Sequence, residues 1–193
     1  MVLKLKTIAK RNTNKRTVKA HLQIRKPTNN DIPELTRNWY SYLEEAKTDL
    51  YFGLGVPNKR PTKAEFTSRY KKDLKQMKKG DAVLLVAESN SRVVDECGVY
   101  AVRPDTDRSH VGGLDMSIIK AYRNMGIGTA LLDKCLKQSR KRFELVTTEL
   151  NVRNRASIRL IEKFGFKIAG RIPHDTKRKR KYLDTYIAYL LMR

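Results

Sequence analysis

The chain of 193 residues contains little cysteine and little histidine. Its two cysteines, Cys97 and Cys135, are too few for a disulfide framework, so a reducing cytoplasm is the simplest location. The three histidines lie far apart along the sequence and show none of the spacings of metal ligands. We therefore expect a cytoplasmic protein without a metal site.

Long apolar runs are missing as well. No stretch approaches the roughly 18 apolar residues that a membrane-spanning helix needs. The first ten residues, Met1 to Lys10, interrupt their apolar side chains with lysines, which is unlike the continuous apolar stretch of a secretory signal. We expect neither a membrane span nor a membrane partner.

Acidic residues are few, since 20 Asp and Glu stand against 42 Lys and Arg and the formal net charge is +22. The excess is concentrated in residues 1–20, which hold seven basic residues and no acidic one, and in the unbroken basic run from Lys177 to Lys181. A positive surface attracts polyanions, so nucleic acid is a candidate partner of both segments. A solubilising surface is equally consistent with the same charges.

The sequence does contain a regular succession of apolar strands and amphipathic helices. We expect a basic arm over residues 1–20 and one domain over residues 21–193, because no linker or repeat interrupts the latter. Strands are predicted over residues 21–25, 82–87, 93–102, 111–119, 145–152, 166–169 and 182–191, and helices over 30–46, 62–80, 128–140 and 156–164. This order predicts an α/β fold with a mixed sheet.

One turn between a strand and a helix, residues 118–129, has the features of a phosphate-binding loop. Gly126 and Gly128 let the backbone turn tightly, and the following helix N-terminus presents free amides while Arg123 adds a charge. The segment is not a Walker A loop, because it contains no GxxxxGK(S/T). It is not a dinucleotide-binding GxGxxG either, because leucine stands at position 131. An ordinary turn with glycines used for packing is the alternative.

Arg123-x-x-Gly126-x-Gly128 resembles the [Gln/Arg]-x-x-Gly-x-[Gly/Ala] signature of the GNAT superfamily of N-acetyltransferases. The stretch from Asn154-x-x-Ser157 to Gly165-Phe166 is similar to the next characteristic stretch of that family, and the order of strands and helices is similar too. The resemblance covers residues 21–193. It implies a single-domain GNAT fold whose mixed, mostly antiparallel sheet of about six to seven strands is splayed in the middle and flanked by about four helices.

The resemblance also implies acetyl-CoA as the cosubstrate, with no metal. The strand around Ser117, Ile118 and Ile119 would pair its backbone with the pantetheine arm, and the sheet would open beyond Ile118. Asn154 would cap the next helix and hydrogen-bond the arm. Backbone amides would cradle the pyrophosphate, and they would come from Arg123, Asn124, Met125, Gly126, Ile127, Gly128 and Thr129.

Amine attack on a thioester requires a neutral amine, a donor for the oxyanion and a proton for the departing thiolate. Many relatives have a tyrosine acid where this chain has Ile161, and some have a glutamate base where it has Asn151. Ser157 matches a serine of N-terminal acetyltransferases of ribosomal-protein type and is our candidate donor to the sulfur. Asp115 is our first candidate for the base or for an amine-binding carboxylate. Glu149, Asp184 and a chain of water molecules are the alternatives for the base.

We therefore expect an N-acetyltransferase that works by direct attack in a ternary complex, as a monomer or homodimer. Its acceptor would be a protein N-terminus, a lysine or a small amine, and Trp39 and Tyr40 would line the acceptor site or belong to the core. A basic mouth repels polyamines and favours an acidic or ribosome-associated acceptor. The alternatives are a nucleic-acid- or ribosome-binding protein on the same scaffold and a catalytically silent sensor that binds CoA.

Overall fold

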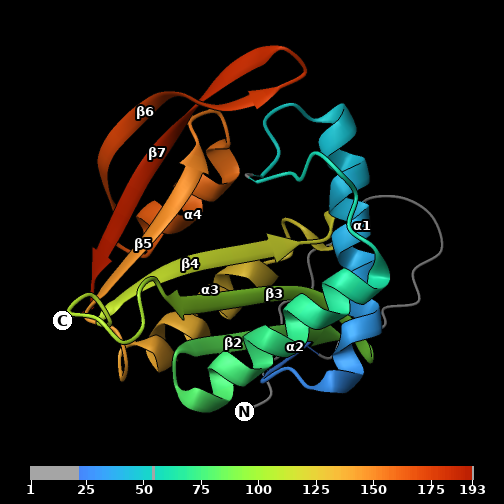
Figure 1. The fold of residues 1–193 in the computed structure, drawn as a ribbon, viewed down its shortest axis with the longest axis vertical. Coiled ribbons are helices and arrows are strands. Elements are labelled where there is room, and N and C mark those ends of the chain that lie inside the picture. Colours follow the sequence, from blue (N-terminus) through green and yellow to red (C-terminus); the bar gives the residue numbers. More distant parts are fainter. Residues whose placement is uncertain (1–21, 54, 193) are drawn as a thin grey trace.

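The computed structural model describes residues 22–53 and 55–192, so the predicted basic arm over residues 1–20 lies outside the described residues (Figure 1). Seven strands form one sheet in the order β1-β2-β3-β4-β5-β7-β6. They are β1 (Leu22–Arg25), β2 (Ala82–Ser89), β3 (Arg92–Ala101), β4 (Val111–Ile118), β5 (Leu145–Asn151), β6 (Lys167–Arg178) and β7 (Lys181–Leu191). The helices are α1 (Ile32–Thr48), α2 (Lys63–Lys79), α3 (Ile127–Ser139) and α4 (Arg155–Lys163). The predicted α/β class and element order are confirmed.

The sheet separates two apolar cores. Helices α1 and α2 cover the face that is in front in Figure 1, where Phe66, Tyr70 and Leu74 pack on β2 and β3. Helix α3 packs behind the sheet, and its Cys135 is fully buried there as the apolar face of the helix predicts. Cys97, on β3, is buried in the same rear core, and neither cysteine of the described chain forms a disulfide. No helix in the described part of the chain is long and apolar enough to cross a membrane.

Helix α2 begins and ends where its sequence predicts. The Thr62 hydroxyl accepts from the Glu65 amide at 3.2 Å, and the Glu65 carboxylate accepts from the Thr62 amide at 2.7 Å, which is a complete capping box. Gly80 ends the helix with φ of +86°, a left-handed conformation that glycine adopts without strain. These local signals fix the helix that forms one wall of the site described below.

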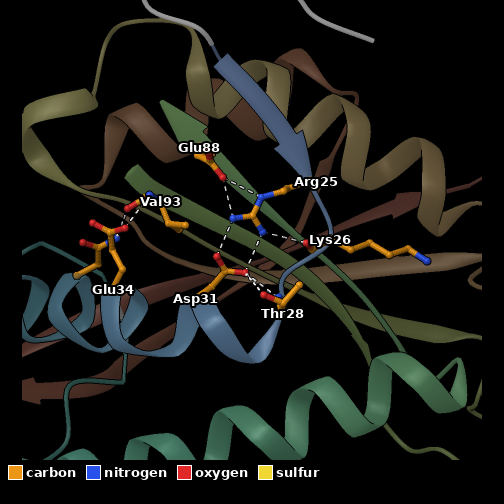
Figure 2. Close-up of polar contacts among 8 residues, drawn as sticks. Arg25, Lys26, Thr28, Asp31, Glu34, Glu88 and Val93 are labelled. Carbon is orange, nitrogen blue, oxygen red and sulfur yellow. Dashed lines mark hydrogen bonds and ion pairs between the residues drawn. The ribbon is translucent and has the colours of Figure 1, made fainter. Parts of the chain in front are cut away.

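An ion-pair network joins β1 to the start of α1 (Figure 2). Arg25 donates to Glu88 on β2 at 2.9 Å and to both carboxylate oxygens of Asp31 at 2.7 and 2.9 Å. Asp31 also accepts from the Thr28 amide at 2.7 Å. Asp31 is the N-cap residue of α1 but makes no side-chain cap bond to it, because its carboxylate is engaged by Arg25 and Thr28.

Strands β4 and β5 are parallel neighbours over three residue pairs only, from Val111↔Leu145 to Gly113↔Thr147. All other neighbouring strands are antiparallel. The sheet therefore opens after Gly113, several residues earlier than the expected position beyond Ile118. The predicted splay in the middle of the sheet is present, and the earlier start leaves one edge of residues 114–118 without a strand partner.

The last two strands form a long hairpin, which corrects the expected short strand over residues 166–169. Strand β6 continues to Arg178, and the two turn residues Lys179 and Arg180 have positive φ values of 48° and 63°. A two-residue turn with both φ values positive matches the twist of a hairpin. The basic run from Lys177 to Lys181 is thus the tip of a hairpin rather than a loop between short strands.

Candidate functional site

A cleft of about 940 Å³ opens where β4 and β5 diverge. Its walls come from the end of α1 and the following loop, from α2, from β3 to β5, and from the N-termini of α3 and α4. Segments that lie far apart in the sequence therefore meet there. The cleft contains the predicted residues Asp115, Ser117, Ile118, Arg123, Asn124, Gly126, Gly128, Thr129, Asn154 and Ser157.

The turn that precedes α3 presents a row of available amides to this cleft. Asn124 and Gly126 have φ values of +61° and +80°, and the first backbone bond of the helix runs from the Ala130 amide to the Gly126 carbonyl at 3.1 Å. Within the described chain, the amides of residues 124–129 donate to no backbone carbonyl. Amides at a helix N-terminus, aligned with its dipole, bind anions. This segment has the donor set that a pyrophosphate requires.

The two glycines of the turn serve different purposes. Gly126 adopts a left-handed φ and has open space around it, so its backbone conformation requires glycine. A Cβ at Gly128 would lie 2.4 Å from Cδ1 of Ile118, so this glycine lets α3 pack closely on β4. Close packing, the alternative at the sequence level, accounts for Gly128, and anion binding by the turn stays a prediction.

Arg123 does not point freely into the predicted phosphate site. Its guanidinium makes a bidentate ion pair with Glu45 on α1, donates to the Ile118 carbonyl at 2.9 Å and lies 4.9 Å from the centre of the Phe52 ring. Its amide donates to the Lys120 carbonyl at 3.3 Å. In this structure the available amides therefore begin at Asn124, and Arg123 ties the turn to the α1 wall.

Other cations line the cleft that the sequence analysis did not single out. Arg155, Arg159 and Lys163 are spaced by four residues along α4, so they share one exposed helix face. That spacing was a readable signal for a cationic stripe. The stripe lies on the same wall as Asn154 and Ser157. It provides positive charge to the cleft, whereas the charge of Arg123 is neutralised by its ion pair with Glu45.

The residues expected to contact the cosubstrate's arm lie around the open edge of β4. Ser117 and Ile118 belong to the part of β4 that has β3 on one side and no strand on the other. The Asn154 Oδ1 caps α4 by accepting from the Ser157 amide at 3.2 Å, as predicted. The half-buried Ser157 lies in the first turn of α4, and Ile119 is buried beside the strand end.

Asn151, the last residue of β5, has an unusual environment in the cleft wall. It is only 2% exposed, and its Oδ1 accepts from the Arg153 amide at 2.9 Å. Its Nδ2 has no hydrogen-bond partner within the described residues. A buried donor without an acceptor costs about 1–3 kcal/mol, so a group that completes this bond would bind favourably.

A cluster of carboxyl groups occupies the α2 side of the cleft. Glu96 on β3 lies opposite Ser117, and Asp115 on β4 lies opposite Gly98, so the two acids are diagonal neighbours on one face of the sheet. Asp73 on α2 faces them, and the Tyr70 hydroxyl hydrogen-bonds with Glu96. Among the described residues, no three His, Cys, Asp or Glu side chains are grouped closely enough to hold a metal ion.

Burial and charge repulsion set the titration of this cluster. Burial first, and then the charges of Asp115 and Asp73, raise the pKa of Glu96 to about 7, against the opposing effects of Arg69 and the Tyr70 hydrogen bond. Burial likewise raises the pKa of Asp73, although Arg69 and Lys72 oppose the shift. A carboxyl group that titrates near neutral pH inside a cleft is suited to proton transfer.

Sequence reasoning found Asp115 but missed Glu96 and Asp73. A signal existed for Glu96, because an acid directly before the apolar stretch of residues 97–102 has to be paired or functional if it is buried with that stretch. The alternative base Glu149 also lines the cleft on β5. Asp184 does not line it, because this carboxylate binds Arg171 and accepts from the His174 amide at 2.9 Å on the hairpin. Trp39 lines the cleft, and Tyr40 instead donates to the Pro61 carbonyl at 2.8 Å.

The tip of the β6–β7 hairpin reaches the loop that follows α1 (Figure 1), and that loop lines the cleft. Arg178 donates to the carbonyls of Leu50 and Phe52 at 3.0 and 2.7 Å, and Lys179 donates to the carbonyl of Lys47. Arg153 donates to the Tyr51 hydroxyl at 2.8 Å. We call Arg153, Arg178 and Lys179 the clasp. Part of the basic run therefore serves an internal contact at the C-terminal end of α1, where cations are favourable.

Comparison with known proteins gives a consistent result. The Acetyltransferase (GNAT) family matches residues 39–166. A curated N-alpha-acetyltransferase of Sulfurisphaera tokodaii is 34% identical over 86 residues, which span 44% of this chain and 47% of that protein, about half its length. The fold is similar to that of the phosphinothricin acetyltransferase of Sinorhizobium meliloti in complex with acetyl-CoA, at 18% identity, a TM-score of 0.75 and 88% coverage of each chain. It is also similar to the ribosomal-protein-alanine N-acetyltransferase of Brucella melitensis, at 22% identity, a TM-score of 0.71 and coverage of 88% and 99%.

Proposed function

The chain belongs to the Acetyltransferase (GNAT) family, and we propose that it transfers the acetyl group of acetyl-CoA to a primary amine by direct attack in a ternary complex. The cleft fits the cosubstrate in three respects. The amides of residues 124–129 suit the pyrophosphate, the open edge of β4 suits the amides of the pantetheine arm, and the cationic stripe of α4 suits further phosphate charge.

The observation that carries the proposal is the position of Glu96 in the cleft. Direct attack requires removal of a proton from the amine, which is an ammonium ion in neutral water. Glu96 has a pKa of about 7, so it is partly ionised at neutral pH and can accept that proton. We assign the role of general base to Glu96. Asp115, which is more exposed than Glu96, would bind the ammonium form of the acceptor amine.

Glu96 takes one proton from the ammonium ion, and the neutral amine nitrogen then bonds to the carbonyl carbon of the thioester. As the carbon–sulfur bond breaks, the nitrogen loses its second proton and the thiolate gains one; Ser157 on the adjacent wall stays the predicted donor, and the proton from the nitrogen restores its hydroxyl. The proton on Glu96 passes to solvent. The products are the acetylated amine and CoA with a free thiol.

The test follows the free thiol released from acetyl-CoA in the presence of a panel of amines, for the wild type and for Glu96→Gln. Removing a general base lowers rates by 10²–10⁴-fold, so we expect kcat to fall at least about a hundredfold. Calorimetry with acetyl-CoA should give the same affinity for both proteins. Glu144→Gln, at an exposed site outside the cleft, is the matched control and should retain full activity.

Two results would overturn the proposal. Wild-type activity of Glu96→Gln, together with loss of activity in Glu149→Gln, would move the base to β5. Binding of acetyl-CoA without thiol release on any amine would instead indicate the silent CoA sensor.

A further inference from the structure

The charges that line the cleft are sorted into two regions. The wall formed by α4 carries the cationic stripe, Arg155, Arg159 and Lys163, and faces the side suited to phosphates. The opposite side, formed by α2, β3 and β4, carries Asp73, Glu96 and Asp115 against one cation among the described lining residues, Arg69. Asp49 and Glu149 line the adjoining loop and strand, where the cations Arg123 and Arg153 line the cleft as well.

The same acceptor side is rich in aromatic rings. Aromatic faces attract cations and pack against methylene chains, so rings alternating with carboxylates favour an aliphatic amine that carries positive charge. Trp39 lies 5.5 Å from Phe66, and Phe66 lies 6.0 Å from Tyr70, which makes a continuous apolar wall beside Asp73 and Glu96. The rings that line the cleft are those of Trp39, Tyr42, Tyr51, Phe52, Phe66, Tyr70 and Tyr100.

The clasp limits the size of the acceptor. Arg178 and Lys179 join the hairpin tip to the loop after α1, and Arg153 joins the end of β5 to Tyr51 in the same loop. The loop after α1 lines the cleft, and the contact between Arg153 and Tyr51 joins two of its walls. A slim, extended molecule passes beside such a contact more easily than the folded surface of a protein.

We infer that the acceptor is a linear aliphatic amine with at least two ammonium groups, of which one reacts at Glu96 and another is held by Asp73 and Asp115. This inference rests on the proposed acetyl transfer and names its substrate class. It reverses the expectation from overall charge, which disfavoured polyamines. The reversal has a physical basis, because exposed charges are screened beyond about 8–10 Å at physiological salt, whereas carboxylates within the cleft contact the ligand directly.

The test compares acceptors of equal chain length and different charge. Putrescine is compared with n-butylamine and with 4-aminobutyrate, and spermidine is added as a longer polyamine, all at saturating acetyl-CoA. We expect kcat/KM for putrescine and spermidine to exceed that for butylamine at least about tenfold, which corresponds to about 1.4 kcal/mol for the second charge. The anionic 4-aminobutyrate should be the poorest acceptor.

Asp73→Asn separates charge recognition from folding. It should lower the ratio of kcat/KM for spermidine to kcat/KM for butylamine about tenfold, because butylamine has no second charge to lose, whereas the effect of Asp73 on the pKa of Glu96 changes both values alike. A readout that needs no turnover is the calorimetric binding of spermidine to the protein loaded with CoA, which should weaken in Asp73→Asn. Asp133→Asn, an exposed acid on α3 outside the cleft, is the matched control and should change neither quantity.

Each outcome decides a separate statement. Equal use of butylamine and spermidine, or a preference for 4-aminobutyrate or for a peptide N-terminus, would overturn the inference while acetyl transfer stands. Absence of thiol release with every acceptor would overturn the proposed function and the inference with it.

Discussion

Replacing Asp115 by Asn should move the acidic limb of the pH–rate profile to lower pH. In the wild type, kcat/KM should rise through a midpoint near pH 7, because Glu96 must lose its proton before it can act as base and its pKa is about 7. The groups around it are Asp115 from β4, Asp73, Arg69 and Tyr70 from α2, and Tyr100 on its own strand. Removing one negative neighbour makes ionisation of Glu96 easier, so its pKa must fall.

The size of the shift follows from the strand register. Diagonal neighbours on one face of antiparallel strands lie about 7 Å apart, and Glu96 and Asp115 are such a pair. Two unit charges at that distance interact by about 2.4 kcal/mol at an effective dielectric of 20 and by about 0.6 kcal/mol in water. Since one pKa unit is 1.36 kcal/mol, the midpoint should fall by about 0.4 to 1.7 units. The exposure of Asp115 favours the lower part of this range.

The assay is thiol release from acetyl-CoA between pH 5 and pH 9, with one acceptor amine used for all variants. The ionisation of the amine then affects every profile equally and cancels in the comparison. Asp115→Asn can lower the absolute rate by weakening amine binding, so the midpoint is the quantity compared. Glu149→Gln is the control with an unshifted midpoint. A midpoint that stays in place or rises in Asp115→Asn would refute the assignment of the titration to Glu96.

Three further predictions concern the turn, the clasp and the network of Figure 2. Gly126→Asp and Gly80→Asp both force a residue into positive φ and should lose similar stability, about 1–2 kcal/mol by urea unfolding, but only Gly126→Asp should abolish calorimetric binding of acetyl-CoA. Arg178→Ala should speed proteolysis of the loop after α1 and raise KM for the amine, whereas Arg180→Ala, in the hairpin turn, should do neither. Asp31→Asn should cost about 1–3 kcal/mol at pH 7. Burial opposes ionisation of Asp31, but Arg25 and Thr28 hold its pKa below the ordinary value. The stability that the carboxylate contributes is therefore present above pH 4 and is lost as pH falls through the lowered pKa. The stability of the variant should then approach that of the wild type in acid.

Local signals explain which parts of the fold and site the sequence could predict. The cap at Thr62, the stop at Gly80 and the turn around Gly126 each depend on a few adjacent residues, so their positions were predictable. The acidic cluster depends instead on the pairing of Glu96 with Ser117 and on the packing of α2 over β3, which no local pattern specifies. Asp115 was predicted through the family resemblance, because other relatives have an acid on the strand before the turn, where this chain has Gly113 and, two residues later on the same face, Asp115.

Strand β6 was mostly missed by prediction from the sequence. Its side chains are exposed along most of its length, so it lacks the alternation of apolar and polar residues by which strands are recognised. Only its first residues were predicted as a strand, and the basic run was therefore assigned to a loop. The hairpin turn at Lys179 and Arg180 also lacks the Asn-Gly or Asp-Gly pair that usually predicts such a turn.

The short junction between β4 and β5 divides the sheet mechanically. Four strands lie on one side and three on the other, and three residue pairs of backbone contact join them. The hydroxyls of Thr147 and Thr148 add bonds to the carbonyls of Gly112 and Leu114 across the same junction. Phe143 and Val146 are buried beneath it. Rotation about this line would leave the ladders of both halves intact, and the clasp, which joins β5 and the hairpin tip to the end of α1 and the loop after it, opposes that rotation.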